Sequence, residues 1–214
     1  MKKCCIDRTL PEDRMRALSF IGVARLVAPK NKQWINGSTL RIRFIGGTAS
    51  QHELVKKEAA WWTEHANLRF LFDNSPNAEI RISFDPNEGA WSYIGTDCAS
   101  IPFDQPTMNL GFMDPGTVAH EFGHALGCGH EHQNPEGGIQ WNEAEVIRDL
   151  QGPPNWWDHS TIRHNVLDKY SFDQVNSTKF DPQSIMLYFF PASWTLNRVA
   201  TVQNDSLSEM GKQF

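Results

Sequence analysis

The chain has 214 residues, 40% of them hydrophobic and 21% charged, which is typical of one globular domain with a sizeable core. Its 20 Lys and Arg against 25 Asp and Glu give a net charge of −5, and no basic run builds a phosphate-binding surface, so nucleic acid is not an expected partner. No apolar stretch approaches the roughly 18 residues of a membrane span, so no membrane partner is expected. No signal peptide follows Met1, which leaves two locations open: the cytosol, or export with a leader missing from this sequence. The oligomeric state is left open as well.

The cysteines are too few for a disulfide scaffold in a chain of this length. They do not form a CxxC pair, so a zinc site built from cysteines is not expected. Buried or free thiols are the expected state, and one bridge stays open. The four residues are Cys4, Cys5, Cys98 and Cys128.

The first half of the chain alternates strand and helix patterns. Residues 1–38 are interpreted as an extension before the main fold, with an amphipathic helix over 14–27. Period-two alternation over 40–45 predicts the first strand, which Gly46 and Gly47 end. From Ser50 the spacing of apolar residues becomes helical and predicts a long surface helix. Further strands are predicted over residues 68–72, 80–84 and 90–94.

A short strand over 107–111 precedes the next helix. Asp114 as a cap and Pro115 in the first helical position predict that this helix runs over 115–126. The rest of the chain is rich in turns, and two more helices are predicted over residues 142–150 and near 160–170. A last short helix is expected to begin at residue 207, with Ser206 or Ser208 able to cap it.

The most informative segment is His120 to His132, which reads HEFGHALGCGHEH. Residues four apart share a helix face, so His120 and His124 can present two imidazoles to one metal ion, while Glu121 reaches toward a water on that ion. If the helix continued, His130 would lie about 9 Å further along the axis, too far to share the ion. Gly127 is placed to end the helix and turn the chain back.

Three histidine ligands leave one or two positions open for water, which distinguishes a catalytic zinc site from a closed structural one. The other histidines lack this spacing and are interpreted as ordinary surface or core residues. These are His52, His65, His132, His159 and His164.

The extended motif HExxHxxGxxH resembles that of the metzincin zinc peptidases. Downstream, Ser184–Tyr188 (SIMLY) is similar to their Met-turn, and Glu131 after the third histidine is similar to the astacin pattern, as is Ile139–Asn142. Some features depart from animal astacins: Gln133-Asn134-Pro135 replaces an arginine-rich continuation, and the spacing of Cys98 and Cys128 differs. The region from Trp91 to Gly111 is at least as matrixin-like.

The resemblance implies roles for the motif residues. His120, His124 and His130 would hold Zn²⁺, and Glu121 would act as general base on the bound water and then as general acid. Tyr188 would be an additional zinc ligand at rest and would donate a hydrogen bond to the oxyanion during attack. Met186 would form a structural floor beneath the metal, with core packing as its other interpretation.

The expected fold class is therefore α+β, a zincin or metzincin fold with a mixed twisted sheet and an active-site helix. The single catalytic domain spans 39–214, with an upper part over 39–132 and a lower irregular part over 133–214 that carries the Met-turn. Residues 1–38 are a candidate pro-segment, in which Cys4, Cys5 or Asp7 could reach the metal, although a simple surface extension is the favoured interpretation.

The expected function is that of a zinc-dependent endopeptidase acting on proteins or peptides. Resemblance to metzincins implies that substrate adds to an edge strand, here the segment from Ala90 to Ile94 and on to Ile101. Two alternatives stay open: a zinc-binding interaction module without catalysis, and a zinc hydrolase of non-peptide amides. Glu121 argues against the first, and a short protected edge strand would favour the second.

Overall fold

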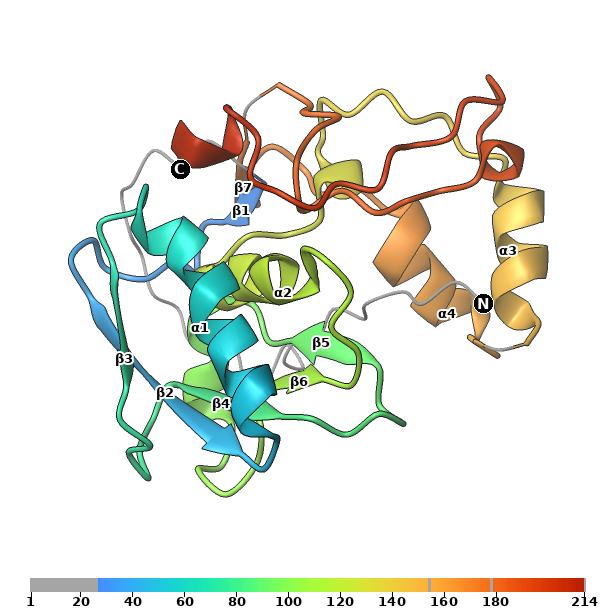
Figure 1. Cartoon of the computed structure of the whole chain (residues 1–214). Coiled ribbons are helices and arrows are strands. Elements are labelled where there is room, and N and C mark those ends of the chain that lie inside the picture. The colour runs from blue at the N-terminus through green and yellow to red at the C-terminus, as the bar shows by residue number, and fades with distance from the viewer. Residues whose placement is uncertain (1–26, 154, 178, 214) are drawn as a thin grey trace.

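The computed structural model describes residues 27–153, 155–177 and 179–213. In it two long helices pack on a sheet, the short helices of residues 143–167 lie to one side, and the chain then returns to the main core before the C-terminus (Figure 1). Except for its last residue, the helix predicted over 14–27 lies outside the described residues. The candidates for latency, Cys4, Cys5 and Asp7, lie outside them too.

The central sheet has five strands. Their spatial order is β3 (Arg69–Phe72), β2 (Thr39–Ile45), β4 (Ile80–Ser83), β6 (Met108–Leu110) and β5 (Ala90–Ser92). The first four run parallel, and β5 pairs antiparallel with β6 at the edge. The predicted mixed sheet and the presence of its five strands are thereby confirmed.

The edge strand is shorter than predicted. It ends at Ser92 rather than at residue 94, and the 3-10 helix η2 (Gly95–Ser100) follows. Gly95 has a φ of +51°, and a Cβ built on it would lie 1.7 Å from the carbonyl oxygen of Lys32. The backbone therefore leaves the strand where another segment of the chain approaches closely.

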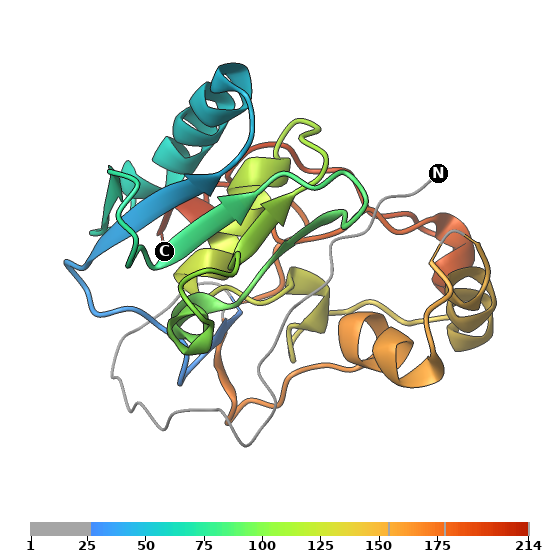
Figure 2. The ribbon, with the colours of Figure 1, turned by 90° about the horizontal axis from the view of Figure 1, so that it is seen from below.

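Helix α1 (Ala49–Thr63) begins with a reciprocal cap. The Thr48 hydroxyl accepts from the Gln51 backbone N–H at 3.3 Å, and the Gln51 side chain accepts from the Thr48 N–H at 2.8 Å. Val55, Ala59 and Trp62 form its buried face. This face packs on helix α2 (Thr117–Leu126), and both helices lie on one face of the sheet (Figure 2).

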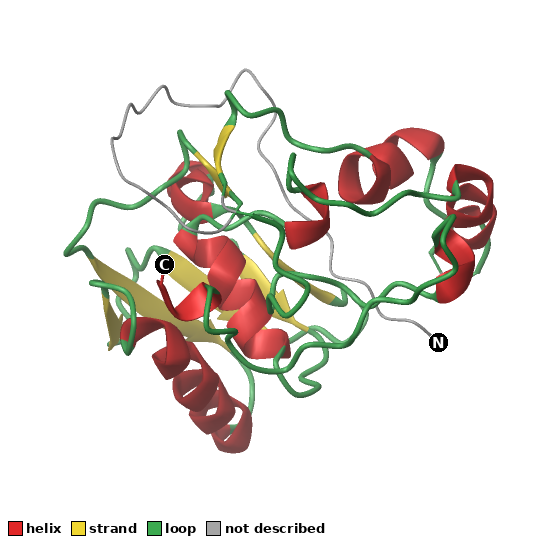
Figure 3. Cartoon of the chain, turned by 90° about the horizontal axis from the view of Figure 1, so that it is seen from above, coloured by secondary structure: helices red, strands yellow, loops and turns green. Residues whose placement is uncertain are grey.

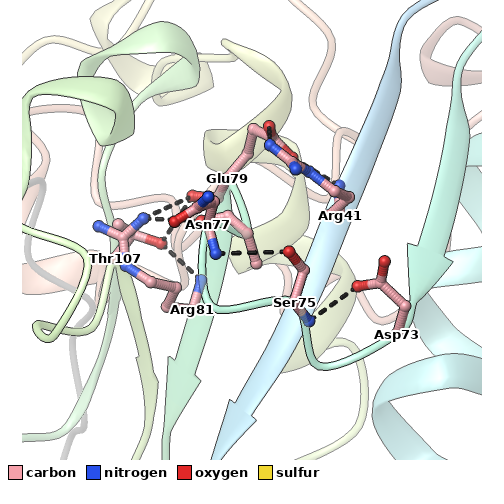
Figure 4. A network of polar contacts seen from close by, with 8 residues as sticks. Arg41, Asp73, Ser75, Asn77, Glu79, Arg81 and Thr107 are labelled. Carbon is pink, nitrogen blue, oxygen red and sulfur yellow. Dashed lines mark hydrogen bonds and ion pairs between the residues drawn. The ribbon is translucent and has the colours of Figure 1, made fainter.

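A buried arginine organises the loop that leads to β6. Arg81 of β4 is 1% exposed, and its guanidinium donates to the backbone carbonyls of Gln105 at 2.7 Å and Ile101 at 3.0 Å. Nearby, Arg41 and Glu79 form an ion pair at 2.6 Å in the polar network of Figure 4. Burial lowers the pKa of Arg81, and the carbonyl oxygens compensate the desolvation of its charge.

The lower part contains α3 (Glu143–Gln151), α4 (His159–Ile162) and the 3-10 helix η5 (Ala192–Trp194), packed around a second hydrophobic cluster. The helix predicted near 160–170 forms over residues 159–167, but it is α-helical only to Ile162 and continues as a π-helical turn, η4 (Arg163–Leu167). The Asn165 side chain donates to the Thr161 carbonyl at 2.9 Å, which is the oxygen that an α-helical N–H at this position would use.

Two short strands join the start of the described chain to the lower part. β1 (Ala28–Pro29) pairs antiparallel with β7 (Val175–Asn176), separate from the main sheet (Figure 3).

In the part of the chain that the structure describes, no helix has the length and apolarity needed to cross a membrane.

The helix predicted to begin at residue 207 is wrong. Over residues 207–213 the structure has a single 3-10 turn, η6 (Gly211–Gln213). The Ser208 hydroxyl accepts from the Gly211 N–H at 2.8 Å and donates to the Asp181 carboxylate at 2.6 Å, so it fastens the segment to the lower part. Leu207 is 8% exposed and packs in the main core. Tertiary contacts thus replace helical ones in a segment too short to sustain a helix alone.

Candidate metal centre

Helix α2 carries the first half of the motif, and all of its residues after Thr117 are buried. It starts two residues later than predicted: Gly116, with a φ of +83°, is its N-cap, and Asp114 contributes only its backbone oxygen, which accepts from Thr117 N–H. The side-chain cap comes from α1, where the Glu58 carboxylate accepts from Ala119 N–H at 3.4 Å. Burial raises the pKa of Glu58, and the backbone N–H groups of α2 oppose that rise.

The helix ends at Gly127, whose φ is +106°. Its N–H and that of Cys128 bond back to the last turn, at 2.8 Å to His124 O and 2.9 Å to Gly123 O, which reverses the chain. A Cβ on Gly127 would lie 3.1 Å from the carbonyl oxygen of Lys32. The N-terminal segment around Lys32 therefore packs directly against the chain reversal at Gly127.

That segment belongs to the predicted extension over 1–38, and its described residues pack on the main domain. Trp34 donates from Nε1 to the Ala125 carbonyl at 2.8 Å. Lys32 forms a buried ion pair with Asp97 at 2.7 Å. The boundary at residue 39 stays a prediction.

The structure brings the three motif histidines together. Nε2 of His124 lies 3.1 Å from Nε2 of both His120 and His130, and His124 and His130 are fully buried. His120 Nδ1 donates to the Ile185 carbonyl at 2.7 Å, and His124 Nδ1 donates to the Cys128 carbonyl at 2.9 Å. A carbonyl oxygen only accepts, so the proton of each ring is on Nδ1 and the Nε2 lone pairs of both rings face the centre.

Lone pairs facing each other at this distance repel unless a cation lies between them. Zinc–nitrogen bonds of about 2.0–2.1 Å at tetrahedral angles would separate the nitrogens by roughly 3.3 Å. The observed 3.1 Å is close to this value. Among the described residues, this triad is the one group of His, Cys, Asp or Glu whose ligand atoms converge on a common point. The donor set therefore fits zinc.

Glu121 follows His120 directly on α2 and is 1% exposed. A carboxylate beside a bound cation would be held in its charged form by that cation, which is the form that can act as a base. Its role as general base stays a prediction.

The segment around Met186 packs against α2 beside the motif histidines. A Cβ on Gly123, between the two helix histidines, would lie 2.3 Å from Met186 Sδ, so the thioether packs directly against α2. Met186 O also accepts from Glu131 N–H at 2.9 Å. The same segment supplies the Ile185 carbonyl that fixes His120.

Tyr188 lies beside the triad and is half-buried. Its ring centroid is 4.2 Å from that of His130 and 5.3 Å from that of His120.

Glu131, the residue after His130, accepts from Asp181 N–H at 3.0 Å and from Asn134 Nδ2 at 2.9 Å. Burial raises the pKa of the Glu131 carboxyl to about 7.

Two residues that contact the helix or the histidines of the site had no clear signal in the sequence. Glu58 caps α2 from another helix, and no spacing rule links them. His132, interpreted as an ordinary residue, is fully buried and lies in ring contact with His130 and Tyr188. Its position two residues after a ligand was the only available signal. By contrast His52 packs on Phe44 in the upper part, with ring centroids 3.9 Å apart.

The cysteines that the structure describes, Cys98 and Cys128, are free and buried. Burial raises the pKa of Cys98 to about 12 and raises that of Cys128 as well. Cys4 and Cys5 lie outside the described residues.

The sheet, the two-histidine helix, the glycine turn to a third histidine and the methionine segment beneath them define a metzincin-type domain. The family model for Astacin, a peptidase family, matches residues 27–214. The chain therefore belongs to the astacin family.

Solved structures agree with this assignment. A structure of myroilysin is similar with a TM-score of 0.84 and 36% identity, covering 87% of this chain and 95% of that one. High choriolytic enzyme 1, a hatching-enzyme zinc protease from Oryzias latipes, has a TM-score of 0.57 at 15% identity over 92% of this chain and 95% of that one, and shows the shared fold.

Curated relatives are longer. Zinc metalloproteinase nas-30 of Caenorhabditis elegans is 31% identical over 50% of this chain and 15% of its own length. Blastula protease 10 of Paracentrotus lividus is 28% identical over 66% of this chain and 23% of its own length. The chain thus matches less than a quarter of either relative.

Proposed function

We propose that this chain is a zinc-dependent endopeptidase that hydrolyses peptide bonds of proteins or peptides. The observation that carries the proposal is the convergence of three buried imidazole nitrogens, His124 Nε2 lying 3.1 Å from each of the others, with Glu121 buried on the same helix. A structural zinc site needs no carboxylate base beside its ligands. Membership of a peptidase family supports the same conclusion.

His120, His124 and His130 hold the metal in this proposal. Zinc there would supply Lewis acidity, making a coordinated water acidic enough to react near neutral pH. Glu121 accepts a proton from the attacking water and then delivers it to the departing amine. Tyr188 donates its hydroxyl proton in a hydrogen bond to the oxygen that becomes negative during attack.

The substrate backbone is proposed to run along β5, the edge strand of the sheet, which directly contacts α2. An extended peptide can add to such an edge by main-chain hydrogen bonds. The strand has only three residues, all of them buried. This short edge keeps a zinc hydrolase of non-peptide amides as the second candidate.

The test is digestion of denatured casein by the wild type and by Glu121→Ala, each with measured zinc content. Glu121→Ala should retain zinc but lose activity by about 10²- to 10⁴-fold, the usual contribution of a general base. Tyr188→Phe should reduce turnover less. Glu53→Ala, which removes an exposed carboxylate of α1, is the control and should cleave like the wild type.

Two results would contradict the proposal. Equal cleavage by Glu121→Ala and the wild type would exclude this mechanism. A zinc-loaded wild type that cleaves no peptide bond but hydrolyses small non-peptide amides would favour the second candidate.

A further inference from the structure

His132 occupies the layer between the metal ligands and the hydrophobic cluster of the lower part. It belongs to the 3-10 helix η3 (Glu131–Gln133). Its ring is nearly parallel to that of His130, with centroids 5.1 Å apart and planes 28° apart, and lies 5.4 Å from that of Tyr188. On another side the ring meets Phe190 edge-on at 5.0 Å and Trp141 at 6.1 Å. His132 therefore touches both a metal ligand and the tyrosine of the site.

The orientation of this ring is set by one hydrogen bond. Nε2 of His132 lies 3.0 Å from the backbone oxygen of Asn165 in η4. Because a carbonyl oxygen only accepts, Nε2 carries the proton and donates. The Asn165 side chain is itself held, through its donation to Thr161 O at 2.9 Å.

The neighbouring residue anchors the same turn. Gln133 donates from Nε2 to the carbonyls of His164 at 2.7 Å and Asp168 at 3.1 Å. It is 5% exposed. The side chains of His132 and Gln133 thus hold two carbonyls of the π-helical turn and one carbonyl just after it, and these bonds fix the position of the His132 ring relative to the turn.

Resting on the proposed function, we propose that His132 is a positioning residue for the metal centre. Its ring holds the planes of His130 and Tyr188, and the bond to Asn165 O holds the ring. The role needs both the flat ring and the N–H donor. A phenylalanine would fill the space without the donor, and a glutamine would supply a donor without the flat surface. Groups that hydrogen-bond to metal ligands typically contribute about 10- to 100-fold in metal affinity or activity, and for the ring contact of His132 we expect the lower end of that range.

The test compares His132→Phe and His132→Gln with the wild type, at equal metal occupancy and well below each melting temperature. Each variant should bind Co²⁺ at least about 10-fold more weakly, show shifted visible absorption bands of the bound Co²⁺, and lower kcat with a smaller change in KM. Trp194→Phe is the matched control. It perturbs the same aromatic cluster through Phe190 at 5.8 Å and should lower stability while leaving the Co²⁺ spectrum and kcat unchanged.

Wild-type Co²⁺ spectra, metal affinity and kcat in folded His132→Phe or His132→Gln would overturn the proposal and leave His132 as core packing. If neither variant folds, ¹⁵N NMR of histidine-labelled wild type decides: a His132 ring protonated on Nε2 supports the proposal, and one protonated on Nδ1 overturns it. A zinc-loaded wild type without peptidase activity would refute the proposed function, while the Co²⁺ spectra and affinities would still test the role of His132.

Discussion

Replacement of Gly123 by alanine tests the contact between α2 and the segment beneath it. In an open helix this change stabilises by about 1 kcal/mol, because glycine has the larger conformational freedom to lose. Here the added Cβ would lie 2.3 Å from Met186 Sδ and 2.9 Å from Trp62 Cζ2. Ordinary contacts between such atoms are about 3.5–4.0 Å, so one neighbour must move by more than about 1 Å.

Neither neighbour moves easily. Trp62 is fixed by donation from Nε1 to Ala119 O at 2.8 Å, and Met186 is fully buried. Overpacking of a core costs about 1–3 kcal/mol, and a clash this close belongs in the upper half of that range. After the helix gain is subtracted, Gly123→Ala should lower the free energy of unfolding by about 1–2 kcal/mol.

Urea unfolding of the zinc-loaded chain measures this change. Met186→Ala should itself cost about 2–5 kcal/mol through the cavity it leaves. In the double variant the new Cβ enters that cavity. The double variant should therefore lose at least about 1 kcal/mol less unfolding free energy than the sum of the losses of the two single variants. Gly138→Ala, with nothing within 4 Å of its Cβ, is the neutral control. A stabilised Gly123→Ala, or strictly additive losses, would refute the contact.

The remaining predictions concern metal, thiols and the C-terminus. The chain should bind about one zinc, and His130→Ala should lose most of it since only three protein ligands are proposed; full retention would contradict the chain reversal. Cys98 and Cys128 should resist iodoacetamide at pH 8 in the native state and react after unfolding, because burial raises the pKa of Cys98 to about 12 and leaves almost no thiolate at pH 8; peptide mass spectrometry locates the label. Deletion of residues 207–214 should lower the melting temperature, as it removes a buried leucine and the bond to Asp181; an unchanged melting curve would mean that the segment contributes nothing.

Regular elements were predictable where local pattern and tertiary packing agree. Alternation over 40–45 and the helical spacing after Ser50 correspond to β2 and α1, because each buries the face that its period defines. The motif histidines could be grouped because helix geometry and one glycine fix their relative positions.

Other features depend on partners distant in the chain. At the π-helical turn a side chain bonds to a backbone acceptor, and β5 ends early where Lys32 approaches Gly95. Glu58 and His132 act through neighbours that come close only in the folded chain. No periodicity in the sequence carries that information.

The bond from His120 to the Ile185 carbonyl spans 65 residues. During synthesis all three imidazoles leave the ribosome well before this carbonyl and Met186 do, and contacts of such separation form only after a long loop has closed. Until then the orientation of His120 and the floor beneath α2 are undefined. The metal centre is therefore completed only after residue 186 has been synthesised, and a nascent chain that ends before this point cannot present it.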